Sequence, residues 1–321
     1  MKIIVTGAAG FIGSHLSERL ALLGHTVIGI DNFNTYYLPQ LKEQNAADLK
    51  EKGVEIARLD LSKDTLDPIL ADTEIIFHLA AQPGISATTP FDQYLNNNLI
   101  ATYNLTESAK KLSTLKLFVN IATSSIYGAH ATDTEEAAPK PTSHYGVTKL
   151  AAEQLVLALF RDKQFPACSV RPFSVYGERE RPEKLYPKLI NSIIDPNYKL
   201  PLYEGSEQHL RSYTYVGDII DGLVLVMENY AKVLGEIFNL GTDTAITTGE
   251  GIKIVEQIMG AAAKIDIKPK RPGDQKETHA NIEKARRILG YNPTTTPQDG
   301  LAKEVAWFKE KIWQKIPLYQ S

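Results

Sequence analysis

The sequence predicts an α/β protein in which a doubly wound parallel β-sheet is followed by a smaller, mixed C-terminal lobe. Three observations lead to this fold class. Short apolar runs alternate with helical patterns through the first half of the chain, glycines follow the first apolar run at regular intervals, and prolines interrupt the pattern after Arg171. We therefore expect one domain over residues 1–171 and a second lobe over residues 172–321, with some segments of the lobe returning to the sheet of the first domain.

The first thirty residues carry the pattern of a dinucleotide-binding βαβ unit. A strand is predicted over Lys2–Val5, and Gly7, Gly10 and Gly13 separate it from an apolar helical pattern. Glycines let the backbone turn tightly and approach a pyrophosphate, which free N–H groups and the positive end of the helix dipole then bind. The order of strand, glycine turn and helix predicts a Rossmann-type sheet.

Asp31 predicts the identity of the dinucleotide. A second strand, Val27–Ile30, delivers this aspartate 24 residues after Gly7. A carboxylate at this point accepts hydrogen bonds from the adenosine ribose and would repel a 2′-phosphate, so NAD is favoured over NADP. Three glycines alone could equally mark a simple turn, but a strand, a helix and an acid at these offsets favour a cofactor site.

The remaining elements follow in chain order. Further strands are predicted at Glu55–Leu59, Ile75–Leu79, Leu117–Ile121 and Ala167–Val170, and long helices at Phe91–Leu112 and Tyr145–Lys163. After Arg171 the pattern becomes rich in loops, and it predicts helices at Leu185–Ile194, Asp218–Asn229, Gly249–Ala263, Asn281–Leu289 and beyond Asp299, with a strand at Glu236–Leu240.

Composition limits the class of protein. A net charge of −3 argues against nucleic acid as the main partner, because phosphate binding needs clustered basic charge. Cys168 is the single cysteine, so an intramolecular disulfide is impossible and a buried thiol is expected. Met1 leads directly into the first strand and no run approaches the ~18 apolar residues of a membrane span. We expect a cytoplasmic protein without a membrane or metal partner.

Tyr145 and Lys149 are the candidate chemical groups. Residues four apart share one helix face. A phenol of pKa about 10 is a poor base, but a neighbouring ammonium and an oxidised nicotinamide favour the phenolate, which can take a proton from a sugar hydroxyl as hydride leaves. Alone, the pair would more often be a surface lysine beside a packed tyrosine. Here Thr123, Ser124 and Ser125 add hydroxyl groups at the carboxyl end of a strand, where such sheets bind ligands.

With these residues in view, the sequence resembles the extended short-chain dehydrogenase/reductase family, in particular its nucleotide-sugar epimerases and dehydratases. The similar blocks cover nearly the whole chain in the family order: TGAAGFIG, IDNFN, FHLAAQPG, TSSIYG, YGVTKLAAE, RPFSVYGERERP, RSYTYVGDI and RPGDQKETHANIEKARRILGY. By this resemblance Thr123, Tyr145 and Lys149 occupy the catalytic positions, and Thr123 would hydrogen-bond the 4-hydroxyl of the sugar. The resemblance assigns NAD binding to Gly7, Gly10, Phe11, Ile12, Gly13, Asp31, Asn32, Asp60, Leu61, Leu79, Ala80, Ala81, Tyr145, Lys149, Pro172 and Phe173.

The resemblance also implies a sugar-nucleotide site in the C-terminal lobe. Arg211 and Arg271 match the arginines that grip the diphosphate, a role that suits a guanidinium fork. The implied substrate-binding set is Ser86, Thr123, Ser124, Ser125, Ser174, Arg181, Arg211, Arg271 and Asp274. A homodimer is implied as well, with the Phe91–Leu112 and Tyr145–Lys163 helices in a four-helix bundle, although burial inside one chain would give equal patterning.

The residues after Thr123 indicate which reaction is favoured. Dehydratases that resemble this chain place an Asp-Glu pair there, which removes water across C5 and C6. Ser124 and Ser125 cannot supply that second proton-transfer set, so 4,6-dehydration is disfavoured. We expect a 4-keto sugar that rotates and takes the hydride back on its other face. The net reaction is inversion at C4 with NAD regenerated, which makes the protein an isomerase.

The sugar is expected to be UDP-glucuronate, converted to UDP-galacturonate. The block RPFSVYGERERP and the paired tyrosines Tyr36 and Tyr37 resemble the UDP-glucuronate 4-epimerases. Ser174, with the serines after Thr123, would hydrogen-bond the carboxylate, and Arg181 is a candidate for the same place, although an arginine in such a charged run could equally be solvated.

Departures from that group keep other functions open. Ser86 stands where many relatives carry Arg, and Glu183 and Glu207 also depart from the usual pattern. UDP-glucose 4-epimerase is therefore the close alternative. A dehydrogenase that releases NADH and a non-catalytic NAD-binding sensor are the remaining ones, and the sensor would predict damage at Thr123, Tyr145 or Lys149, all of which are intact.

Overall fold

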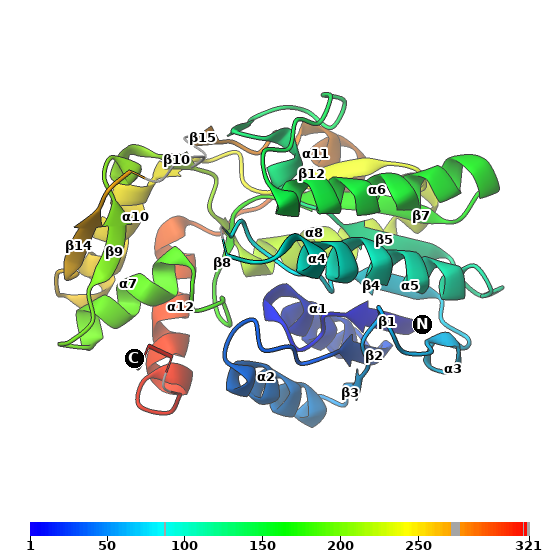
Figure 1. Ribbon diagram of the computed structural model, residues 1–321, viewed down its shortest axis with the longest axis horizontal. Helices are drawn as coiled ribbons and strands as arrows, with labels where there is room; N and C mark the ends of the chain where they lie inside the picture. The colour runs from blue at the N-terminus through cyan, green and yellow to red at the C-terminus, as the bar shows by residue number, and fades with distance from the viewer. Residues whose placement is uncertain (87, 271–276, 317, 320–321) are drawn as a thin grey trace.

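A seven-stranded parallel sheet lies at the centre of the molecule (Figure 1). The computed structural model describes residues 1–86, 88–270, 277–316 and 318–319. The strand order is β12-β7-β5-β4-β1-β2-β3, so the chain starts in the middle, winds to one edge, and returns to wind to the other. The strands are β1 (Lys2–Thr6), β2 (Thr26–Asp31), β3 (Glu55–Arg58), β4 (Ile75–His78), β5 (Leu117–Ile121), β7 (Ala167–Pro172) and β12 (Ile237–Leu240). This arrangement confirms the predicted fold class.

Helices cover both faces of the sheet because the strands bury both of their faces. Ile3 and Val5 of β1 pack in the core cluster with Leu16 and Leu20 on one side, whereas Ile4 belongs to the cluster on the other side. The helices associated with the sheet are α1 (Phe11–Leu22), α2 (Pro39–Glu51), α3 (Asp67–Leu70), α4 (Phe91–Tyr94), α5 (Ala101–Ala109), α6 (His144–Lys163), α8 (Val216–Glu228), α9 (Tyr230–Val233) and α11 (Glu283–Leu289).

The helix predicted over Phe91–Leu112 contains a π-helical segment, η1 (Leu95–Ile100), between α4 and α5. Asn98 lies in this widened turn. Its carboxamide oxygen accepts the backbone N–H of Gln82 at 2.7 Å, and its amide nitrogen donates to the Thr148 hydroxyl at 3.0 Å. The extra residue in the turn therefore joins this helix to the loop after β4 and to α6.

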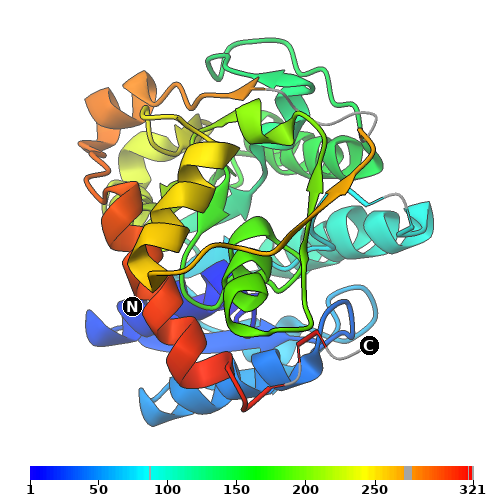
Figure 2. The ribbon, with the colours of Figure 1, turned by 90° about the vertical axis from the view of Figure 1, so that its left-hand side faces the viewer.

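The C-terminal lobe has a hydrophobic core of its own beside one end of the sheet (Figures 1 and 2). Leu189, Leu202, Val255 and Leu301 meet there from four different elements. The lobe contains α7 (Leu185–Ile194), β9 (Leu200–Tyr203), η3 (Ser206–Gln208), α10 (Thr248–Met259), β14 (Ile265–Lys268), α12 (Pro297–Trp307) and η4 (Phe308–Ile312). Three small sheets complete it: β13 (Ile246–Thr247), β10 (Leu210–Arg211), β15 (Glu277–Thr278) and β6 (His130–Ala131) form one, β8 (Val175–Tyr176) and β11 (Thr214–Tyr215) another, and β9 with β14 the third.

Segments cross between the two parts in both directions. Two elements from the second half of the chain belong to the first domain. The strand β12 pairs with β7, and the helix α8 packs on α1. Conversely β6, from the first half, pairs with β15 in a sheet of the lobe. Within the described ranges, none of the helices combines the length and apolar character that a bilayer crossing requires.

Candidate active site

A cleft of about 1790 Å³ lies between the carboxyl ends of the central strands and the C-terminal lobe. Both parts of the chain line it. Every site residue that the sequence analysis named and the structure describes lines this one cleft: Gly7, Gly10, Phe11, Ile12, Gly13, Asp31, Asn32, Asp60, Leu61, Leu79, Ala80, Ala81, Ser86, Thr123, Ser124, Ser125, Tyr145, Lys149, Pro172, Phe173, Ser174, Arg181 and Arg211. Arg271 and Asp274 lie outside the described residues.

The glycine turn forms a cradle that only glycine permits. Gly7 has a φ of +70°, and a Cβ built on it would lie 2.9 Å from the backbone nitrogen of Ala80. A Cβ on Gly13 would lie 2.1 Å from the carbonyl oxygen of Gly7. Helix α1 begins directly after Gly10, which caps it without any side-chain hydrogen bond. Free N–H groups therefore face the cleft, and this arrangement fits the pyrophosphate of a dinucleotide.

Asp31 ends β2 at the edge of this cradle, where the adenosine ribose would lie. Its Oδ2 accepts the backbone N–H of Ala9 at 3.1 Å, and its Oδ1 accepts that of Phe33 at 2.8 Å. Lys42 Nζ lies 3.8 Å from Oδ1. Burial lowers the pKa of Lys42, and the Asp31 charge opposes that shift. The sequence analysis gave Lys42 no role, because this ion pair joins residues on different elements.

A chain of hydrogen bonds through His78 holds the backbone at Ala80, which lines the cleft. His78 Nδ1 lies 2.8 Å from the Thr6 hydroxyl, and its Nε2 lies 2.8 Å from that of Thr102. The Thr6 oxygen also accepts the backbone N–H of Ala80 at 3.1 Å. Burial lowers the pKa of His78 to about 3, with a smaller contribution from Lys149. The neutral ring therefore fixes the backbone at Ala80 without adding charge.

Tyr145 and Thr123 meet in the cleft from α6 and from the end of β5. The Thr123 hydroxyl lies beside that of Tyr145 and favours its ionised form. Burial raises the pKa of Tyr145, and the Thr123 hydroxyl and the Arg181 charge oppose the rise. We expected Lys149 to acidify this phenol, and that role stays a prediction. Arg181, which the sequence analysis named for the substrate site, adds a positive charge that lowers the pKa of Tyr145, and it reaches the cleft from a loop far along the chain.

Lys149 lies one helical turn beyond Tyr145 and is almost completely buried. Burial lowers the pKa of its ammonium to about 8, and the charge of Glu153 opposes the shift. Ser143 caps the same helix, because its hydroxyl accepts the backbone N–H of Gly146 at 3.1 Å. The cap fixes the start of α6 and with it the position of Tyr145.

The hydroxyl-rich turn after β5 is ordered by Thr123 itself. Its Oγ1 accepts the backbone N–H of Ser125 at 3.1 Å and caps the short helix η2 (Ser124–Tyr127). Ser124 and Ser125 line the cleft beside it. Ser174, which follows β7, lines the same cleft and completes a group of neutral hydroxyl donors.

Arg181 lies in the cleft, so the reading of it as a solvated surface residue is wrong. Its side chain is 16% exposed, its Nη1 lies 2.6 Å from Glu183 Oε1, and its guanidinium lies 5.8 Å from the centre of the Tyr36 ring. Lys184 also lines the cleft, and the sequence analysis did not identify it. Burial lowers its pKa, and Glu180 opposes the shift.

Ser86 uses its hydroxyl within a local turn. The Oγ accepts the backbone N–H groups of Thr88 at 3.2 Å and Thr89 at 3.1 Å. Arg211 belongs to β10 at the far side of the cleft, where it pairs with Ile246 and Thr278 of neighbouring strands. The cleft therefore has hydroxyl groups at the Ser86 side and cationic groups toward the lobe.

The chain is similar to known proteins over nearly its whole length. Residues 3–241 match the model of the NAD dependent epimerase/dehydratase family. An uncharacterized UDP-glucose epimerase of Bacillus subtilis is 35% identical over 96% of this chain and 98% of its own. UDP-glucuronate 4-epimerase 4 of Arabidopsis thaliana is 33% identical over 96% of this chain and 75% of its own.

Solved structures agree with these relatives. UDP-glucuronic acid 4-epimerase from Bacillus cereus, in complex with UDP-glucuronic acid and NAD, superposes with a TM-score of 0.91. It is 35% identical, and the match covers 96% of this chain and 99% of that one. The resemblance inferred from the sequence blocks is thereby confirmed, and this chain belongs to the NAD dependent epimerase/dehydratase family.

Proposed function

We propose that the protein is an NAD-dependent UDP-glucuronate 4-epimerase, which interconverts UDP-glucuronate and UDP-galacturonate through a transient 4-keto sugar. The observation that carries this proposal is that Thr123, Tyr145 and Lys149 line the same cleft as the glycine cradle. The similarity to the Bacillus cereus and Arabidopsis thaliana epimerases supports the choice of sugar.

The mechanism assigns a separate task to each of these residues. When bound, NAD accepts the hydride from C4 and returns it. Tyr145 takes the proton of the 4-hydroxyl and later gives it back, and Thr123 aligns that hydroxyl. Lys149 is buried in the cleft and would offer its positive charge to the bound cofactor. Asp31 binds the adenosine ribose at the other end of the cofactor site.

Neutral donors are proposed to hold the carboxylate of the sugar. A 4-keto uronic acid is a β-keto acid, which loses carbon dioxide when its carboxylate turns out of the ring plane. Hydroxyl groups of Ser124, Ser125 and Ser174 can solvate the carboxylate in the plane without neutralising it, which slows that loss. Lys184 and Arg211 supply positive charge for the diphosphate, and the charge of Arg181 is already paired with Glu183.

UDP-glucose is the second candidate substrate, and a specific observation favours it. Ser86 offers a hydroxyl where the sequence analysis expects an arginine in many relatives, and that hydroxyl accepts two backbone N–H groups. One cation fewer on this side of the cleft weakens the case for an anionic sugar. Dehydration is disfavoured because Ser124 and Ser125 replace the Asp-Glu pair that it requires.

The test is conversion of separate samples of UDP-glucuronate and UDP-glucose, followed by NMR of the C4 proton. We expect inversion of UDP-glucuronate, and no accumulation of absorbance at 340 nm, because NADH does not leave the enzyme. Turnover of UDP-glucose alone would overturn the choice of sugar. A steady rise at 340 nm would instead indicate a dehydrogenase.

We also propose that the protein is a cytoplasmic homodimer assembled through α4, α5 and α6. Phe91, Ile100, Tyr103 and Val147 support this proposal, because these large apolar side chains are exposed on those helices and on η1. Leu105 of α5 is fully buried inside the chain and is not available to such an interface.

The dimer is tested by light scattering after size-exclusion chromatography of wild type and Tyr103→Glu. A charge at a buried apolar interface should halve the mass. A wild-type protein with the mass of one chain would contradict the proposal. Fractionation of the source cells would test the cytoplasmic location.

A further inference from the structure

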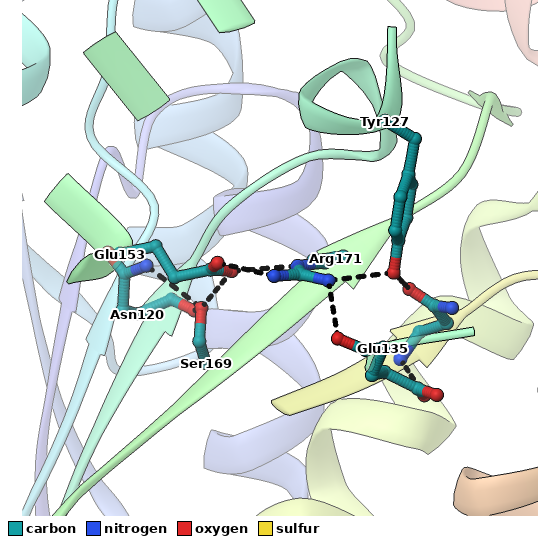
Figure 3. Close-up of polar contacts among 7 residues, drawn as sticks. Asn120, Tyr127, Glu135, Glu153, Ser169 and Arg171 are labelled. Carbon is teal, nitrogen blue, oxygen red and sulfur yellow. Dashed lines mark hydrogen bonds and ion pairs between the residues drawn. The ribbon is translucent and has the colours of Figure 1, made fainter. Parts of the chain in front are cut away.

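One guanidinium group joins the two elements that carry the proposed chemistry. Arg171, at the end of β7, is 1% exposed. On one side its Nε and Nη2 donate to the two carboxylate oxygens of Glu153 at 2.9 and 2.6 Å. On the other side its Nη1 donates to the Tyr127 hydroxyl at 2.8 Å. Figure 3 shows Arg171 between these two partners.

Each partner lies next to a proposed catalytic residue. Glu153 is on α6, one helical turn beyond Lys149 and two turns beyond Tyr145, so the three side chains lie on one helix face. Tyr127 is the last residue of η2, the turn that begins directly after Thr123. The network therefore runs from the base-carrying helix to the hydroxyl-carrying turn through three side chains.

Glu153, Tyr127 and Arg171 each form a further hydrogen bond with a residue around the network. Ser169 donates to Glu153 Oε2 at 3.0 Å, and Tyr127 donates to Asn239 Oδ1 at 2.9 Å. The Arg171 Nη1 also donates to the carbonyl oxygen of Glu135 at 3.3 Å. A buried ion pair is weak evidence for stability, because its desolvation cost offsets much of its attraction. Its place between two functional elements needs another explanation.

We propose that Glu153 and Tyr127 are positioning residues, through which Arg171 fixes Lys149 and the Thr123 turn relative to each other. This inference rests on the proposed epimerase function and deepens it. Glu153 has a second effect, because its negative charge keeps the buried Lys149 ammonium protonated: it opposes the fall in the Lys149 pKa. Tyr145 and His78 are further titratable groups near Lys149, and the His78 ring is neutral at working pH.

Tyr127→Phe tests whether Tyr127 fixes the position of the turn after Thr123, because it removes only the bridging hydroxyl. We expect kcat to fall at least about tenfold while KM for the sugar nucleotide stays unchanged, since small misplacements of reacting groups act on the chemical step. Tyr291→Phe is the matched control, because Tyr291 is also buried, and its hydroxyl has no hydrogen-bond partner among the described residues. Equal kcat in the two variants would overturn this half of the proposal.

Glu153→Gln tests whether the negative charge of Glu153 keeps Lys149 protonated. Loss of the carboxylate lowers the pKa of Lys149 further, so the alkaline limb of the kcat profile should move to lower pH by about one unit. Tyr127→Phe should leave this limb in place. An unmoved limb in folded Glu153→Gln would overturn the assignment. If Glu153→Gln does not fold, the double variant Glu153→Met/Arg171→Met removes both charges and takes its place.

A second readout separates this inference from the proposed function. NAD affinity of the cofactor-free protein is measured by calorimetry across pH 7 to pH 10, where deprotonation of Lys149 weakens binding of the ribose. We expect the NAD affinity of Glu153→Gln to begin falling at a lower pH than that of wild type. If wild type converts neither sugar nucleotide, the proposed function fails, whereas coincident NAD curves for the two proteins overturn the role of Glu153.

Discussion

The Thr123 hydroxyl lies beside the Tyr145 hydroxyl, and it lowers the pKa of a phenol that burial raises. The two residues come from different elements, α6 and the segment after β5. Thr123 therefore acts on the proposed base directly, in addition to its expected contact with the sugar. Lys149 is placed to hold charge near the cofactor, and its pKa of about 8 leaves it protonated at neutral pH.

Replacement of Tyr145 by Phe should lower kcat by about 10² or more, the scale expected when a general acid–base is lost. The change removes one oxygen atom and leaves the ring in its place. Steady-state conversion of UDP-glucuronate, with NAD binding as the control, measures the effect. Normal turnover by this variant would remove Tyr145 from the mechanism.

Replacement of Thr123 by Ala should lower kcat and move the acidic limb of its pH profile toward higher pH. The reason is that the phenol loses the neighbouring hydroxyl that lowers its pKa. Thr123→Ser keeps the hydroxyl and should restore most of both properties. A Thr123→Ala profile of wild-type shape would show that the hydroxyl does not tune Tyr145.

The parts of the site that the sequence predicts are those encoded by local spacing. The glycine cradle, Asp31, and the four-residue interval from Tyr145 to Lys149 each lie within one or two consecutive elements. A sequence pattern can identify such groups because the backbone period fixes which side chains share a face. All of them line the cleft.

The parts that the sequence does not predict depend on contacts between distant segments. Arg181 reaches the neighbourhood of Tyr145 from a loop 36 residues further along the chain. The π-helical turn at Asn98 is equally invisible to a helical pattern, because it is stabilised by partners on another loop and on α6. Only tertiary packing decides such features, so the sequence analysis left a solvated Arg181 open as an alternative and did not predict the π-helical turn.

Replacement of Asp31 by Ala should weaken NAD binding about 10- to 100-fold, the cost of losing hydrogen bonds to a charged group. The variant also removes the acceptor of the Ala9 N–H and the partner of Lys42. Calorimetric titration of cofactor-free protein with NAD and with NADP measures the change. Glu43→Gln is the control, because Glu43 is exposed and pairs with Arg58. Unchanged NAD affinity in Asp31→Ala would mean that the ribose is held elsewhere.

Glu304 of α12 lies near Glu180 of the loop at the cleft, and neither carboxylate oxygen of Glu304 has a hydrogen-bond partner among the described residues. Glu304 is fully buried and Glu180 is 5% exposed. Burial raises the pKa of Glu180 from an ordinary value of 4.5 to about 7, and it raises the pKa of Glu304 well above its usual range. The folded chain therefore binds more protons here than the unfolded chain does.

This excess of bound protons sets the sign of a stability prediction. Because the folded pKa lies above the unfolded one, the contribution of the pair is complete below about pH 4.5 and is lost as pH rises through about 7. Glu304→Gln removes one of the two buried carboxyl groups and is neutral at every pH. Its melting temperature relative to wild type should therefore rise between pH 5 and pH 8, as measured by thermal denaturation at constant ionic strength. Glu310→Gln, at a site whose side chain is 70% exposed, should follow the wild-type curve, and a Glu304→Gln curve parallel to wild type would show that the pair does not hold the excess proton.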